Sequence, residues 1–143
     1  MAPLNLHTTS ESKVLASLRI VVAVIFTLAG LCKLVVPTLI MAFHEQLDTA
    51  GIPFHHSLHL PVPIIEMVIG YFLFMGKFTR FWSFVGLILM IPAIYVHLQI
   101  TDPTLFPMQP MMPIIPIIVI GLCAVLVFKG AGNWSKDLDI FEK

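Results

Sequence analysis

The sequence predicts an all-α fold, a bundle of four helices that span a membrane. Hydrophobic residues make up 58% of the 143-residue chain and charged residues only 11%, whereas a soluble domain has about 25% charged residues. The charges fall in short clusters between long apolar runs, and these runs lack the polar face that a helix of a soluble bundle shows. We therefore expect contact with membrane lipid. The eight basic residues only balance the eight acidic ones, so nothing indicates nucleic-acid binding.

Four apolar runs have the length of membrane spans, since about 20 apolar residues cross roughly 30 Å of hydrocarbon. The helices are expected at about 14–36, 60–77, 81–100 and 112–129. Together they form one transmembrane domain over 13–130, flanked by polar tails at 1–12 and 131–143. The first run is not followed by a small-x-small cleavage site, so we interpret it as a retained helix and not as a signal peptide.

Lysine and arginine predict the orientation, because they concentrate on the cytoplasmic side of membrane proteins. Seven of the eight basic residues fall on one side of the predicted bundle, and only Lys33 approaches the other. The seven are Lys13, Arg19, Lys77, Arg80, Lys129, Lys136 and Lys143. Both termini should therefore be cytoplasmic, with the segments 37–60 and 101–111 outside.

Two further patterns concern helix packing. Small residues recur seven apart at Ala16, Ala23 and Gly30, which predicts a face of the first helix that a neighbouring helix can approach closely. In the outside segment 38–50, apolar residues recur every four positions, while charged ones point elsewhere. We expect a short amphipathic helix there, either on the outer membrane surface or as a lid over the bundle.

Four ionisable residues lie within the predicted spans, where a charge is costly to bury, so each is a candidate functional residue. They are Arg19, Lys33, Glu66 and His97. A rise of about 1.5 Å per residue, counted from the outer helix ends, places the last three at one level roughly 6–8 Å inside the outer boundary. We expect Lys33 to pair with Glu66 and His97 to hydrogen-bond to the same carboxylate. Arg19, near the cytoplasmic end, is expected to snorkel to the inner interface.

Three interpretations of the cluster of Lys33, Glu66 and His97 stay open. A structural ion pair would lock three helices together, because buried ion pairs can fix helix register. Alternatively, the cluster handles protons or binds the head group of a quinone-like ligand, since an imidazole and a carboxylate can exchange hydrogen bonds with its carbonyl and hydroxyl groups. The third interpretation is an ion pathway.

The outside segments also collect side chains that bind metals. They are His44, His55, His56 and His59 on one segment and Met108, Met111 and Met112 on the other. Imidazole and thioether ligands together suit copper. The spacing matches no specific metal site, so copper binding or transport is an alternative and not the leading interpretation.

Several short sequence motifs occur in a fixed order along the chain, and their order and spacing together are more specific than any one motif. They are Arg19; Leu28-Ala29-Gly30-Leu31-Cys32-Lys33-Leu34 with Pro37; Gly51-Ile52-Pro53; Ile64-Ile65-Glu66 with Gly70 and Gly76; a small-residue face ending in His97; and Gly130-Ala131-Gly132-Asn133-Trp134-Ser135 with Asp137. Over 14–137 this order resembles the DoxX family of small bacterial membrane proteins. Lys136 departs from the family pattern, which more usually has an apolar residue there.

The resemblance implies a four-helix bundle in the bacterial cytoplasmic (inner) membrane. It also implies association with membrane redox systems, because the family is named for subunits of a thiosulfate:quinone oxidoreductase and an oxidase assembly. We recognise no redox-cofactor ligands in the sequence, so an accessory subunit of an oxidoreductase fits better than a stand-alone enzyme. Expected partners are other membrane redox proteins or further copies of the chain, and a quinone is the candidate ligand. A structural assembly factor without a ligand is the remaining alternative.

Overall fold

The computed structural model describes residues 11–141, with side chains described as far as residue 138, and every regular element in that range is a helix. The elements are α1 (Lys13–Val35), α2 (Pro37–Thr49), α3 (His55–Leu58), α4 (Pro61–Met75), α5 (Thr79–Gln99), the 3-10 turn η1 (Pro103–Leu105), α6 (Ile114–Lys129) and α7 (Lys136–Phe141). Three stretches are long and apolar enough to cross a membrane, namely α1, His55–Met75 and α5, and α6 is a shorter apolar helix. The predicted all-α membrane bundle is confirmed.

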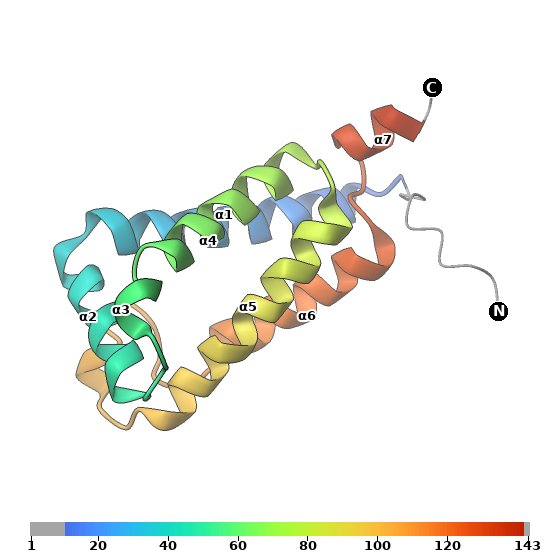
Figure 1. The fold of residues 1–143 in the computed structure, drawn as a ribbon. Coiled ribbons are helices and arrows are strands. Elements are labelled where there is room, and N and C mark those ends of the chain that lie inside the picture. Colours follow the sequence, from blue (N-terminus) through green and yellow to red (C-terminus); the bar gives the residue numbers. More distant parts are fainter. Residues whose placement is uncertain (1–10, 142–143) are drawn as a thin grey trace.

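The four long helices form two antiparallel pairs (Figure 1). α1 packs along α4, and α5 packs along α6. The pairs lie close together at one end of the bundle, where α1 begins, α6 ends and α7 lies, and they diverge toward the other end. We call the first the terminal end and the second the loop end. At the loop end α2, α3 and the η1 segment lie between the two pairs.

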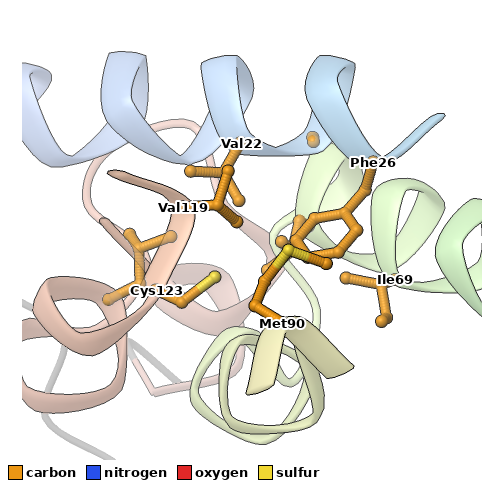
Figure 2. Packing of buried hydrophobic residues seen from close by; sticks show 9 residues of the cluster. Val22, Phe26, Ile69, Met90, Val119 and Cys123 are labelled. Carbon is orange, nitrogen blue, oxygen red and sulfur yellow. The ribbon is translucent and has the colours of Figure 1, made fainter. Parts of the chain in front are cut away.

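The main core lies where the four long helices meet (Figure 2). Phe26 of α1, Ile69 of α4 and Cys123 of α6 are almost fully buried there, and Met90 of α5 and Val119 of α6 complete the contact. These residues come from all four helices, so the core fixes how the two pairs pack against each other.

Two glycines explain why α1 and α4 pack so closely. A Cβ atom on Gly30 would lie 2.5 Å from the carbonyl oxygen of Pro63, and one on Gly70 would lie 2.9 Å from that of Ala23. Both distances are shorter than a side-chain carbon tolerates. The predicted packing face of the first helix is present, because Ala16, Ala23 and Gly30 are all buried.

The amphipathic segment predicted at 38–50 forms α2. Its buried face carries Phe43 and Leu47, which pack in a second apolar cluster with Val96, Ile100 and Phe106. These partners belong to the end of α5 and to the η1 segment. The apolar face of α2 therefore packs against protein, which corresponds to the lid alternative more closely than to a helix on the lipid surface.

The segment predicted as a polar tail after residue 130 packs onto the terminal end. Ala131 and Ser135 are buried, and α7 follows them. The carboxylate of Asp137 accepts hydrogen bonds from the backbone N–H groups of Phe78 and Thr79, at 2.7 and 2.8 Å. Asp137 therefore caps α5, which begins two residues earlier than expected. Of the tail predicted at 1–12, residues 1–10 lie outside the described residues.

Candidate functional site

Lys33 of α1 and Glu66 of α4 form an ion pair near the loop end. The Lys33 ammonium lies 2.5 Å from Oε1 of Glu66, whose side chain is only 4% exposed. The same ammonium lies 5.1 Å from the centre of the Phe43 ring on α2, a cation–π distance. Lys33 thus connects two long helices with α2. Among the described residues, Oε2 of Glu66 is buried without a hydrogen-bond partner.

A pocket of about 600 Å³ lies beside Lys33, between α1, α2 and α6. The segment 107–109 closes one side of it. Its wall is mostly apolar, and its polar members are Cys32, Lys33, Gln46 and Gln109. The apolar members are Ile25, Leu28, Ala29, Leu39, Ala42, Phe43, Pro107, Met108, Ile115, Ile118 and Val119. Such a wall, with few polar groups in fixed positions, is typical of a site for a small apolar ligand with a polar head.

His97 is close to the loop end but makes different contacts from those expected. Its Nδ1 atom is 2.9 Å from the carbonyl oxygen of Met111, and its ring stacks on Phe106 at a centroid distance of 4.4 Å. The expected hydrogen bond to Glu66 is not found in the described part of the chain. The reason is that the segment after α5 folds back over the helix end and brings an otherwise unpaired carbonyl to the imidazole. His97 therefore positions the segment that supplies Pro107, Met108 and Gln109 to the pocket.

Arg19 does not snorkel, contrary to the prediction. Its side chain is fully buried, and its guanidinium donates to five backbone carbonyl groups. Two belong to Leu73 and Phe74 at the end of α4, and three belong to Ala131, Asn133 and Trp134. Carbonyls at a helix end lack the N–H partner of a further turn, and among the described residues that of Leu73 has, besides Arg19, only the N–H of Gly76. The guanidinium finds these acceptors inside the protein, so its side chain does not extend to the membrane–water interface. Arg19 thereby links α1 to α4 and to the segment before α7.

The four histidines of the segment 37–60 line one cleft of about 320 Å³ at the loop end, between α2 and α3. The three methionines do not join them. Met108 lines the pocket beside Lys33, Met111 offers its carbonyl to His97, and the side chain of Met112 is largely exposed. The structure therefore separates the two kinds of ligand that the sequence suggested for copper.

Comparison with known proteins identifies the family. The sequence profile of the DoxX family matches residues 14–99, more than half of the 143 residues. The chain belongs to the DoxX family. No curated protein and no solved structure matches it. The matched DoxX region includes Arg19, Lys33, Glu66 and His97, and it ends before α6. As a DoxX protein with apolar helices, the chain is a membrane protein, and the family is often associated with redox and oxidase complexes.

Proposed function

We propose that this DoxX protein is an accessory membrane subunit of a redox complex, and that it holds the head group of a quinone-like lipid in the pocket beside Lys33. The observation that carries the proposal is a mostly apolar pocket of about 600 Å³ with a single charged side chain on its wall. An apolar wall accommodates a ring and an isoprenoid chain, and a positive donor suits a carbonyl oxygen.

The ion pair supports this role for Lys33. An ammonium group has three N–H donors, and among the described residues one of them goes to Glu66. The remaining donors are left for an acceptor in the pocket. Because Glu66 is almost fully buried, it holds the ammonium in place, and the ligand meets a donor whose position is already fixed.

The proposal also includes an orientation. Seven of the eight basic residues belong to the terminal end by sequence, so we place that end in the cytoplasm and the loop end, with the pocket, on the outer side of the bacterial inner membrane. A ligand dissolved in the outer leaflet then reaches the pocket directly. Electron transfer itself is assigned to a partner protein of the same membrane.

The test is binding of a short-chain benzoquinone analogue to the purified full-length chain in nanodiscs, measured by calorimetry. The double variant Lys33→Met/Glu66→Gln removes the donor without leaving one charge buried alone, which would be strongly destabilising. We expect its affinity to fall roughly 10- to 100-fold, the loss of one hydrogen bond to a charged group. Lys129→Met, which removes an exposed lysine at the terminal end, should bind like the parent.

Helicity and the unfolding midpoint of each variant show whether it is folded. If the folded double variant binds the analogue as tightly as the parent, the pocket beside Lys33 is not the site. If the parent itself does not bind the analogue, the proposal of a quinone ligand is wrong.

A further inference from the structure

The histidine cleft at the loop end shares no lining residue with the Lys33 pocket. It brings together imidazoles from two elements. The rings of His44 on α2 and His59, directly after α3, meet edge to face with centroids 4.7 Å apart. The rings of His55 and His56 lie 4.1 Å apart, and Nε2 of His55 is 3.4 Å from a carboxylate oxygen of Asp48.

The ligand atoms in the cleft indicate which metal it would take. Imidazole nitrogen dominates the lining, and the carboxylates of Glu45 and Asp48 add oxygen. Only one thioether, that of Met41, is present. Nitrogen and oxygen ligands favour divalent transition metals, whereas cuprous ion prefers sulfur ligands and Ca²⁺ and Mg²⁺ prefer oxygen alone.

The number of converging side chains limits the type of site. Across the described residues, no group of three or more His, Cys, Asp or Glu side chains is arranged to hold a metal ion. The rings of His44 and His59, by contrast, are in edge-to-face contact between α2 and the end of α3. We propose that these two imidazoles bind one divalent transition-metal ion, Cu²⁺ or Zn²⁺, with water in the remaining positions.

Such a site differs in behaviour from a structural metal site. Structural zinc sites are closed by four protein ligands, whereas open positions are filled by water and allow exchange. With two protein ligands at an exposed cleft, the ion is exchangeable, and its chemical role is capture or transfer at the membrane surface. The proposal does not depend on the quinone pocket.

The test is titration of the purified full-length chain in detergent with Cu²⁺ alone, followed by electron paramagnetic resonance and calorimetry. We expect one ion per chain and a spectrum with nitrogen hyperfine coupling. His44→Ala/His59→Ala should lower the Cu²⁺ affinity at least about tenfold, because even outer-shell partners of metal ligands contribute 10- to 100-fold. Neither side chain is buried, so we expect the variant to keep its fold, and circular dichroism checks this.

Two controls make the result decisive. Met111→Leu/Met112→Leu removes thioethers near the same end of the bundle and should leave the Cu²⁺ affinity unchanged. Mg²⁺ should produce no binding heat. The proposal is overturned if the double histidine variant binds Cu²⁺ as tightly as the parent, or if the methionine variant is the one that loses binding.

Discussion

Replacement of Arg19 tests whether the terminal end is held together by one side chain. In Arg19→Lys the positive charge remains, but an ammonium has three donors and can serve at most three of the five carbonyls that the guanidinium binds. At least two of these carbonyls then lose their arginine donor, although the carbonyl of Leu73 keeps the backbone N–H of Gly76 as a second donor. Leaving a buried acceptor without a donor costs about 1–3 kcal/mol, and three of the five contacts are only partly buried, so we expect the free energy of unfolding to fall by about 1–3 kcal/mol.

Arg19→Met is the more severe change, because it removes the arginine donor from all five carbonyls, of which that of Leu73 keeps another donor, the N–H of Gly76. We expect a larger loss than for lysine. That loss is comparable with the whole free energy of unfolding of a small domain, about 5–15 kcal/mol, so this variant should be largely unfolded or poorly inserted.

The measurement is unfolding of the purified protein in mixed micelles with increasing sodium dodecyl sulfate, followed by circular dichroism. Lys13→Met is the matched control, since it removes a positive charge from the same helix at an exposed position. It should change the midpoint little. If Arg19→Lys unfolds at the same detergent fraction as Lys13→Met, the guanidinium does not carry the contacts described.

Two further predictions concern packing and protonation. Gly70→Leu should lower the free energy of unfolding by about 1–3 kcal/mol in the same assay, because a side chain there meets α1, and a variant as stable as the parent would contradict the close packing. At the loop end, the hydroxyl and then the backbone N–H of Thr104 donate hydrogen bonds to Asp102, and they lower the pKa of its carboxyl below its usual range. The ionised form therefore stabilises η1 at neutral pH, and this stabilisation is lost only as the pH falls through the lowered pKa. Titration of the carboxyl carbon by nuclear magnetic resonance checks this, and Thr104→Val should return the midpoint toward the ordinary aspartate range.

The fold and one ion pair could be predicted because both depend on simple physical rules. Apolar runs of the right length leave few options in a membrane. Lys33 and Glu66 have opposite charge and similar depth in neighbouring spans, so pairing them avoids two isolated buried charges. The structure agrees on both points.

The contacts of Arg19 and His97 could not be predicted, because their partners are backbone carbonyls. A carbonyl has no signature in the sequence, and the positions of the Met111 carbonyl and of three of the five Arg19 acceptors depend on the path of the irregular segments 100–113 and 130–135. These segments are rich in proline and glycine and have no period that fixes their path. The sequence grouped the four histidines on one segment, but it did not predict that they line one cleft apart from the methionines, because that cleft lies between α2 and α3.

The main core restricts what can pass along the bundle axis. Phe26, Ile69 and Cys123 leave almost no accessible surface at mid-bundle, and Gly86 lies against the ring of Phe26. Val119 belongs both to this core and to the wall of the pocket beside Lys33, so the pocket lies directly against the core. A molecule in the pocket could move further along the axis only by displacing these packed side chains, so the core would hold a bound lipid at the loop end.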